Sequence, residues 1–452
     1  MEFRDEVVAR TIPDQPRGIT ATVVRLLQEL IREACVNDGS VASGQEIRAV
    51  RVLQRFFDGL PVETQVFESQ PGRASLVVRL RGTDPEAPKL GLLGHTDVVP
   101  VDPDGWVRDP FAGDIVDGEV WGRGAVDMLY LTASFAAVVR EWALAEERPK
   151  GDLVLVAVAD EEAGSEHGME WLMAQCPEAV RVTEVLGESG GMRVGDHIAI
   201  EVGEKGSAGR RIIVRGEPGH ASIPYGAHNA IVRAGKVLQL LENTSAQTVL
   251  GSTWDAFVDA RVADPDLAAR LRDPRTLDAA ITELGKTAGY ANAITRTTVS
   301  PTIARSGVAH NVIPGVATID LDIRTLPGTS DDDVDALLRE TLAPVAEWVE
   351  IERLLGNEAT MSPADTELFT AVCDAIREIA DAPVMPMLAA GGSDCRYYRD
   401  LGVPAYGFGL LAPGWTYEKY RERIHGHNER IDLESIELTL AALQHVVRAR
   451  IS

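Results

Sequence analysis

Residues 90–100 read LGLLGHTDVVP, an apolar run that ends in a histidine and an aspartate. The LGLL run is typical of a buried strand, and GHTD marks its passage into a loop. In open α/β sheets, sites are built at the carboxyl ends of the strands. Side chains two residues apart in an extended chain point to the same side, so we expect His95 and Asp97 to converge. His95 can then bind a metal ion through one ring nitrogen while Asp97 holds the other nitrogen.

Strand-like and helix-like segments alternate around this stretch. Apolar residues recur at helical spacing in TATVVRLLQELIREA and in residues 128–142, and GDLVLVAVADEEAG is an apolar strand that ends in acids. This alternation predicts an α/β fold with a mostly parallel sheet and helices on both of its faces. Further strands are expected at residues 63–68, 74–80 and 89–95, and GDIVDGEVWGRG carries the Asp-Gly signal of a hairpin.

The character of the chain changes near Gly203 and returns to the α/β pattern past Glu350. The intervening part is Gly-rich and strand-like, and it contains an Asp- and Ala-rich helical insertion near residues 253–284. The segment SDDDVDALLRETLAPVAEWV is expected to form one helix with an acidic first turn. We therefore predict a discontinuous catalytic domain, residues 1–204 plus 356–452, interrupted by a smaller α+β domain over residues 205–355.

Composition limits the class of protein and its partners. The 452 residues are 45% hydrophobic and 25% charged, which is ordinary for a globular protein of more than one domain. A net charge of −25 argues against nucleic acid or an anionic membrane as a partner. No apolar run approaches the roughly twenty residues of a membrane span. Residues 1–15 lack the apolar core of a secretion signal, and the four cysteines are dispersed, so we expect a cytoplasmic protein.

Acidic and histidine residues follow the ends of several other predicted strands. Each of them has a plain structural alternative: a helix cap, a solvated strand end, a turn residue or a surface loop histidine. Together they would gather at one edge of the sheet, where the mutual repulsion of the carboxylates requires cations. These residues are Asp127, Glu161, Glu162, Glu188 and His425.

Histidine and carboxylate ligands without thiolates suit zinc, manganese or cobalt in a catalytic site. Two such ions about 3.5–4 Å apart, bridged by one carboxylate, activate a water molecule and polarise a carbonyl group. One acid must stay off the ions to take the proton of the water. Glu161 and Glu162 can divide these tasks because adjacent side chains diverge at a strand end, but the spacing leaves open which residue does which.

Motifs along nearly the whole chain carry a resemblance to a known family. GHTDVVP is followed, in order, by WVRDPFAGDIVDGEVWGRGAVDM, DEEAG and HGHNE. The set resembles the aminoacylase, carboxypeptidase G and succinyl-diaminopimelate desuccinylase family of dinuclear zinc amidohydrolases. Relatives usually follow their bridging aspartate with Met-Lys-Gly, whereas this chain has DMLYL. The departure places the chain in a distinct branch.

The resemblance implies a ligand set for two divalent ions in each subunit. Zinc is the first expectation, with manganese or cobalt as alternatives. Asp127 would bridge the two ions. His95 and Glu188 would complete one site, and Glu162 and His425 would complete the other. His427 competes with His425 for this place; the family pattern of His, two residues, Asn or Asp, then Glu favours His425.

The middle domain resembles the family's ferredoxin-like lid, which also forms a homodimer interface. GHASIP matches a lid motif, which implies that His220 stabilises an oxyanion, reaching across to the partner subunit's site. HNVIPG and DIRTLPG match positions that bind the substrate's carboxylate, so Asn311 and Arg324 are candidates, with a strand-end ion pair as the alternative for Arg324. GGSD resembles a substrate-cradling loop, formed here by Gly391, Gly392 and Ser393.

We therefore hypothesise a hydrolase of an amide bond beside a free carboxylate, acting on an N-acyl amino acid or a short peptide. Glu161 would be the general base, and Asp97 the orienting partner of His95. Peptidase, deacylase and desuccinylase activities are not separable from these residues. The alternative is a catalytically silent member of the family that binds ligands or serves as an assembly subunit.

Overall fold

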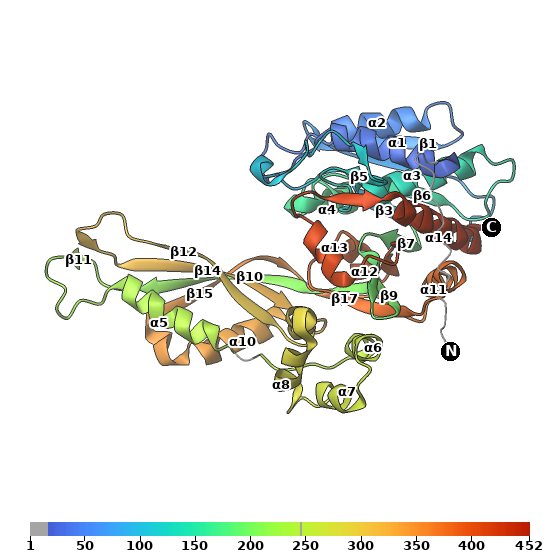
Figure 1. Cartoon of the computed structure of the whole chain (residues 1–452). Coiled ribbons are helices and arrows are strands. Elements are labelled where there is room, and N and C mark those ends of the chain that lie inside the picture. The colour runs from blue at the N-terminus through green and yellow to red at the C-terminus, as the bar shows by residue number, and fades with distance from the viewer. Residues whose placement is uncertain (1–16, 245) are drawn as a thin grey trace. The chain divides into compact units, whose positions relative to one another are not determined.

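The chain folds into two compact units (Figure 1), in a computed structural model that describes residues 17–244 and 246–452. The first unit contains the described residues up to Ile200, together with Ala364–Val384 and Leu401–Ser452. The second contains the described residues of Glu201–Pro363, together with Met385–Asp400. The expectation about a secretion signal falls outside the described residues. No helix within the described part is long and apolar enough to cross a membrane.

One segment departs from the predicted division of the chain. Residues 385–400, expected in the catalytic domain, belong to the second compact unit. The physical reason is a buried ion-pair cluster, in which the Arg399 guanidinium lies 3.2 Å from Glu201 and 2.9 Å from Glu204. Removing either carboxylate would leave this buried cation short of a partner, so the cluster fixes the segment to its unit.

A six-stranded sheet forms the centre of the first unit. Its strand order is β1-β2-β6-β3-β7-β18, and β6, β3, β7 and β18 run parallel, while β2 is antiparallel to both of its neighbours. The predicted mostly parallel sheet is therefore confirmed. The strands are β1 (Glu63–Gln70), β2 (Arg73–Leu80), β3 (Leu90–His95), β6 (Leu153–Val158), β7 (Glu184–Gly187) and β18 (Ala405–Gly407). All residues of β2, β3 and β6 are buried, as expected for strands covered on both faces.

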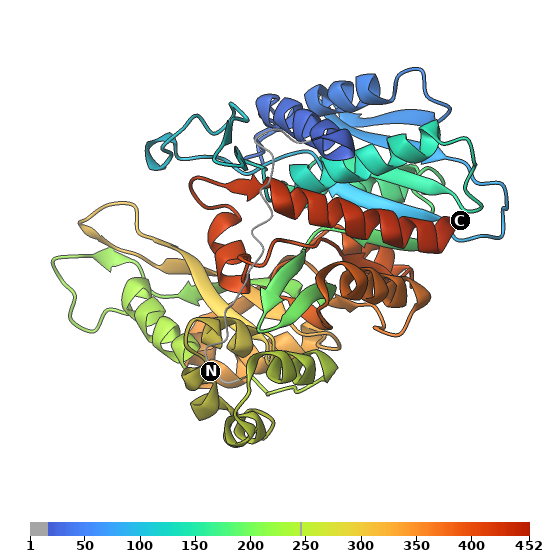
Figure 2. The same ribbon diagram turned by 45° about the vertical axis from the view of Figure 1, so that its right-hand side comes forward.

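Helices of the first unit pack on this sheet and on one another. Helix α3 contacts β2, β3 and β6, and α14, the long red helix of Figure 2, contacts α1, α3 and α11. The helices are α1 (Gly18–Arg32), α2 (Ile47–Phe57), α3 (Leu129–Leu144), α4 (Met169–Gln175), α11 (Glu367–Ala380), α13 (Tyr417–Arg423) and α14 (Leu433–Ile451).

A small antiparallel sheet joins two distant segments of the first unit. Its order is β19-β5-β4, formed by β4 (Ile115–Val116), β5 (Glu119–Trp121) and β19 (Arg430–Asp432). Asp117 and Gly118 both have positive φ in the turn between β4 and β5, as a two-residue hairpin of type I′ requires. The predicted Asp-Gly hairpin is thus confirmed, and its second strand lies beside the segment that follows His425.

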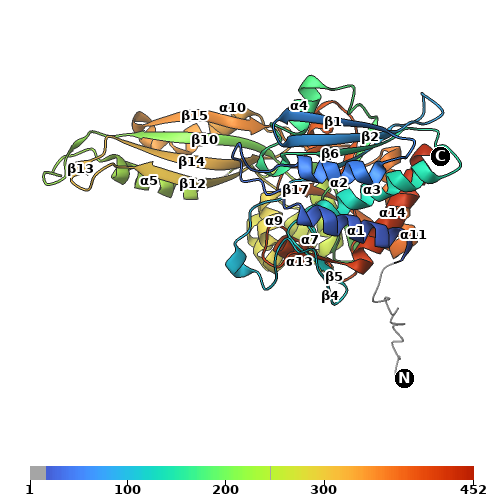
Figure 3. The same ribbon diagram turned by 90° about the horizontal axis from the view of Figure 1, so that it is seen from above.

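The second unit contains a four-stranded antiparallel sheet with the order β12-β14-β10-β15. With two helices, α5 and α10, it forms a β-α-β-β-α-β unit, which is the predicted ferredoxin-like arrangement. Figures 1 and 3 show both helices on the same face of this sheet, where their apolar residues form one core with β10 and β14. The elements are β10 (Gly206–Arg215), α5 (Ala230–Glu242), β12 (Thr298–Ser306), β14 (Val316–Thr325), α10 (Asp331–Thr341) and β15 (Val349–Asn357).

Smaller elements complete the chain. Two short strands, β11 (Gly219–His220) and β13 (Val312–Ile313), pair with each other. A further sheet has the order β16-β9-β17, with β8 also paired to β9. The remaining elements are β8 (Gly190–Val194), β9 (His197–Glu204), β16 (Thr360–Met361), β17 (Val384–Ala389) and α12 (Cys395–Asp400).

The helical character expected near residues 253–284 is confirmed, and helices continue past residue 284. These helices are α6 (Ser252–Arg261), α7 (Pro265–Leu271), α8 (Leu277–Ile281) and α9 (Ala288–Ala293). The single helix expected over residues 330–349 is wrong in its second half. Helix α10 ends at Thr341, and a 3₁₀ segment follows over Ala343–Trp348 with Pro344 in its first turn. Proline has no N–H to continue the α-helical ladder, which explains the break.

Candidate metal centre

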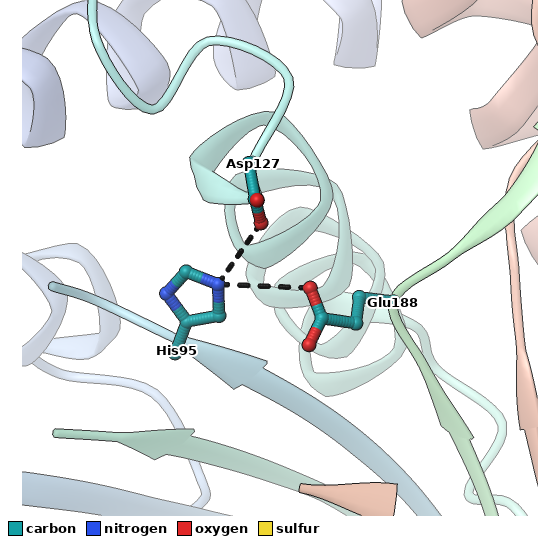
Figure 4. Close-up of side chains that lie close together, drawn as sticks. All are labelled: His95, Asp127 and Glu188. Atoms are coloured by element: carbon teal, nitrogen blue, oxygen red, sulfur yellow. Dashed lines mark hydrogen bonds and ion pairs between the residues drawn. The ribbon is translucent and has the colours of Figure 1, made fainter. Parts of the chain in front are cut away.

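His95, Asp127 and Glu188 come together at the carboxyl ends of neighbouring strands (Figure 4). His95 ends β3, Glu188 directly follows the adjacent β7, and Asp127 lies just before the first turn of α3. The His95 side chain is 1% exposed, and its Nε2 lies 3.2 Å from Asp127 Oδ1 and 3.7 Å from Glu188 Oε2. The sheet therefore brings three potential ligands to one point.

A second group uses the other oxygen of the same aspartate. His425 Nε2 lies 3.2 Å from Asp127 Oδ2 and 3.1 Å from Glu162 Oε2. Among the described residues, these two groups are the sets of histidine and carboxylate side chains with ligand atoms within 4.8 Å of one another. Asp127 is common to both, with one oxygen facing each group. This is the geometry that a bridging ligand between two cations needs.

The charges at the centre fit the binding of cations. Burial raises the pKa of Glu188 to about 8 and also raises the pKa of Glu162. Burial alone would raise the pKa of Asp127 as well, but hydrogen bonds from the two histidines hold it well below its usual range. Glu162 Oε1 is buried and accepts no hydrogen bond from the described residues. Divalent cations would partner this oxygen and favour ionised carboxylates throughout.

The pKa values of both histidines are raised as well. Burial alone would lower the pKa of His95, but hydrogen bonds to Asp127, Asp97 and Glu188 raise it well above its usual value. Hydrogen bonds to Asp127 and Glu162 raise the pKa of His425 to about 10. Both shifts have the same physical cause, which is the set of carboxylates that surrounds the two imidazoles. Because a metal ion binds the neutral imidazole, metal binding at these nitrogens would compete with protons.

Asp97 meets His95 through its backbone more closely than through its side chain. The His95 Nδ1 atom lies 2.9 Å from the Asp97 carbonyl oxygen and 3.5 Å from the Asp97 carboxylate. The carboxylate instead accepts the backbone N–H groups of Glu161 and Glu162, at 3.3 and 3.1 Å. Asn37 also donates to it, at 2.9 Å. Asp97 therefore fixes both the imidazole and the turn that carries the adjacent acids.

The structure distinguishes the two members of each pair of candidate ligands, Glu161 and Glu162 on one hand and His425 and His427 on the other. Glu162 belongs to the second group, whereas Glu161, although it lies in the same turn, belongs to neither. Likewise His425 reaches Asp127, whereas His427 Nε2 lies 3.9 Å from Asp102 and is outside both groups. The geometric grouping thus contains Glu162 and His425 and leaves Glu161 and His427 outside it.

The other predicted site residues belong to the second unit. His220 is exposed on β11, and its Nδ1 lies 2.8 Å from Ser222 Oγ. The Asn311 carbonyl accepts the N–H of Ala221, so Asn311 lies close to His220 at the two-stranded sheet formed by β11 and β13. Arg324 donates to Asp322 at 2.8 Å, which is the ion pair considered as its alternative.

The GGSD loop is divided between exposed and buried positions. Gly391 and Gly392 are exposed, whereas Ser393 is buried. The Ser393 hydroxyl donates to the buried carboxylate of Glu204 at 2.7 Å, and this hydrogen bond fixes the buried end of the loop. Asn37 and Glu204 were not predicted from the sequence, and no local motif marks either residue.

The sequence and the fold are similar to those of known hydrolases. A family model described as Peptidase family M20/M25/M40 matches residues 91–449. The chain is 27% identical to the N-fatty-acyl-amino acid synthase/hydrolase PM20D1 of Xenopus tropicalis, over 88% of this chain and 81% of that protein. It is 29% identical to a succinyl-diaminopimelate desuccinylase of Cereibacter sphaeroides, over 77% of this chain and 80% of that protein. The fold is similar to that of an M20 family metallo-carboxypeptidase from Sulfolobus solfataricus, with a TM-score of 0.72, 17% identity, and coverage of 96% of this chain and 99% of that one.

Proposed function

Because the chain belongs to peptidase family M20/M25/M40, a family of metallohydrolases that act on amide bonds, we propose that it cleaves an amide bond beside a free carboxylate. The substrate is an N-acyl amino acid or a short peptide, and the centre holds two divalent ions, most simply zinc. The observation that supports this most directly is Asp127, whose two oxygens face two separate groups of ligands.

Two cations held here would supply a Lewis acid for the substrate carbonyl and a water molecule of lowered pKa. His95 and Glu188 would hold one ion, Glu162 and His425 the other, and Asp127 would be shared. Histidine and carboxylate donors without thiolates also suit manganese and cobalt.

Glu161 is the proposed general base. It would take the proton of the attacking water and return it to the nitrogen of the leaving amine. Asp97 keeps this residue in place, since its carboxylate accepts the backbone N–H groups of the Glu161–Ala163 turn. The same carboxylate directs the neighbouring Glu162 to the second ligand group.

The second unit would bind the substrate away from the bond that breaks. Arg324 is the proposed partner of the substrate carboxylate, because a guanidinium can bind a carboxylate through two hydrogen bonds. Asn311 is the second candidate for binding the same carboxylate. Gly391, Gly392 and Ser393 would form a cradle for the acyl group or peptide. The names of the two relatives, an N-fatty-acyl-amino acid synthase/hydrolase and a succinyl-diaminopimelate desuccinylase, support an N-acyl substrate over a longer peptide.

The proposed partners are small molecules and a second copy of the chain. A net charge of −25 disfavours nucleic acid and anionic membranes. The cysteines Cys35, Cys176, Cys373 and Cys395 are free, which supports a reducing, cytoplasmic location.

Metal removal tests the proposed function. We expect the chain purified without chelators to contain two divalent ions and to hydrolyse members of a panel of N-acyl amino acids and dipeptides. Chelation should abolish hydrolysis, and zinc, manganese or cobalt should restore it, because the carbonyl and the water both depend on the cations. Metal content well under one ion per chain, with no recovery on adding metal, would instead support a catalytically silent, ligand-binding or assembly subunit.

His220 provides a test of the proposed homodimer. Ile223 and Tyr225, close to it in sequence, are 73% and 98% exposed, as expected for a surface that a partner subunit covers. We expect a dimeric mass by light scattering, and a loss of about 10²–10³-fold in kcat for His220→Asn, since it removes an oxyanion donor.

Hybrid dimers decide whether His220 acts across subunits. Mixing the inactive variants His220→Asn and Glu161→Gln should restore about a quarter of the wild-type rate, because half of the dimers are hybrids and each contains one complete site. No recovery after demonstrated subunit exchange would show that His220 acts within its own chain.

A further inference from the structure

Glu429 is a fully buried carboxylate that faces the backbone in front of Asp127. It is 0% exposed. Its Oε1 accepts the N–H groups of Val126 and Asp127, at 2.7 and 3.0 Å. Its Oε2 accepts the N–H of Gly124 at 3.2 Å and the Arg123 guanidinium at 2.7 Å. The two carboxylate oxygens are thus used almost entirely to hold the segment that ends in Asp127.

The same network reaches the second ligand group. Arg123 also donates to the backbone carbonyl of His425, at 3.3 Å. The backbone of Glu429 accepts the N–H of Gly122, next to the pairing of β5 with β19. Arg123 and Glu429 therefore connect the segment that carries Asp127 to the segment that carries His425, although these segments lie about 300 residues apart in sequence.

Burying the charged Glu429 carboxylate costs solvation free energy, which a purely structural role would not require. Burial raises the pKa of Glu429, while the charge of Arg123 and the N–H donors of Asp127 and Val126 oppose the rise. A buried ion pair contributes little net stability compared with an apolar pair of the same size. A carboxylate does, however, fix the orientation of the backbone, because the N–H groups of two successive residues, Val126 and Asp127, must both point at its Oε1 oxygen. The orientation of the Asp127 backbone sets where the two oxygens of its side chain point.

We propose that Glu429, with Arg123, is a positioning residue for the metal centre: it orients Asp127 so that each carboxylate oxygen faces one ligand group, and it fixes His425 opposite. This inference rests on the proposed metal centre. Glu429 belongs to neither ligand group, so it acts through the residues that do. Partners in this outer position commonly change metal affinity without contacting the ion.

Glu429→Gln tests the inference through metal binding. The amide keeps the size of the side chain but places an NH₂ group against backbone N–H donors. We expect zinc affinity, measured by titration calorimetry, to fall about 10–100-fold. We also expect the visible absorption spectrum of the cobalt-loaded variant to differ from that of the wild type, because the ligands are displaced. A role in stability alone would move neither quantity in folded protein.

Asp152→Asn is the matched control. Asp152 is another buried carboxylate of the same unit, accepting the Arg79 guanidinium at 3.0 Å and the N–H of Gly82 at 2.9 Å. It directly precedes β6, at the opposite end of the sheet from His95, since Leu153 pairs with Leu90 and Val158 with His95. We expect this variant to lose thermal stability and to retain wild-type zinc affinity and the wild-type cobalt spectrum.

A second variant keeps the test decisive if Glu429→Gln does not fold. Arg123→Lys retains a cation beside Glu429, but its single amine cannot also reach the His425 carbonyl. We expect it to weaken zinc binding at one of the two sites. Wild-type zinc affinity and cobalt spectra in the folded variants, or an equal loss in Asp152→Asn, would overturn the inference while leaving the metal centre intact. A wild-type chain that binds no zinc would overturn the metal centre itself.

Discussion

Glu161→Gln is expected to retain both bound metal ions and to lose about 10²–10⁴-fold in kcat, the usual contribution of a positioned general base. The amide keeps the shape of the side chain but cannot accept a proton from water. Glu161 lies in neither ligand group, so its substitution should not change the affinity for the metal ions. Metal content by elemental analysis and kcat at saturating substrate measure the two effects separately.

The adjacent residue gives the control for this experiment. Glu162→Gln should lose metal from the second group, because Glu162 belongs to that group and its Oε2 lies 3.1 Å from His425 Nε2. Two residues in one turn would then show opposite phenotypes, one in proton transfer and the other in metal content. If Glu161→Gln remained nearly as active as the wild type, the base would have to be another residue.

Asp127→Asn is expected to weaken metal binding at both sites together, by more than the roughly 10–100-fold typical of losing an outer partner. The substitution replaces one oxygen by an NH₂ group, which cannot bind a cation, and removes the negative charge shared between the groups. Hydrolysis should fall with metal occupancy. Titration calorimetry with zinc, followed by activity at defined free zinc, measures both quantities.

Asp102→Asn is the corresponding control, since Asp102 is an exposed acid whose nearest histidine, His427, belongs to neither group. It should bind two ions as the wild type does. An Asp127→Asn variant that lost one ion and kept the other at wild-type affinity would show that Asp127 serves a single site. The bridging geometry would then not describe the loaded protein.

Much of the centre could be predicted because its residues follow the ends of apolar strands. The runs that form β3 and β6 are buried along their whole length, and a strand of this kind is visible in sequence. Once these strands are placed side by side in parallel, His95 and the turn at Glu161 must meet at one edge. The Asp-Gly hairpin before Asp127 was equally local and equally predictable.

What escaped prediction depends on contacts that no local pattern encodes. Asn37 and Glu429 meet the site through hydrogen bonds to residues far away in the chain, which no local periodicity predicts. The same holds for residues 385–400, whose unit is decided by Arg399 and its buried partners. The break after Thr341 differs in kind, since Pro344 stands in the sequence itself and its missing N–H outweighs the apolar periodicity that favours a longer helix.

The pairing of β5 with β19 has a consequence for the order in which the protein matures. Contacts such as that between Val126 and Glu429 join residues 303 positions apart, and closing so long a loop costs chain entropy that only later contacts offset. The strands β3 and β6 pair over a much shorter separation. The loop that brings Asp127 and His425 together is therefore among the long loops of this unit. The group of Asp127, Glu162 and His425 thus depends on contacts of long sequence separation, and a folding intermediate without those contacts would lack it.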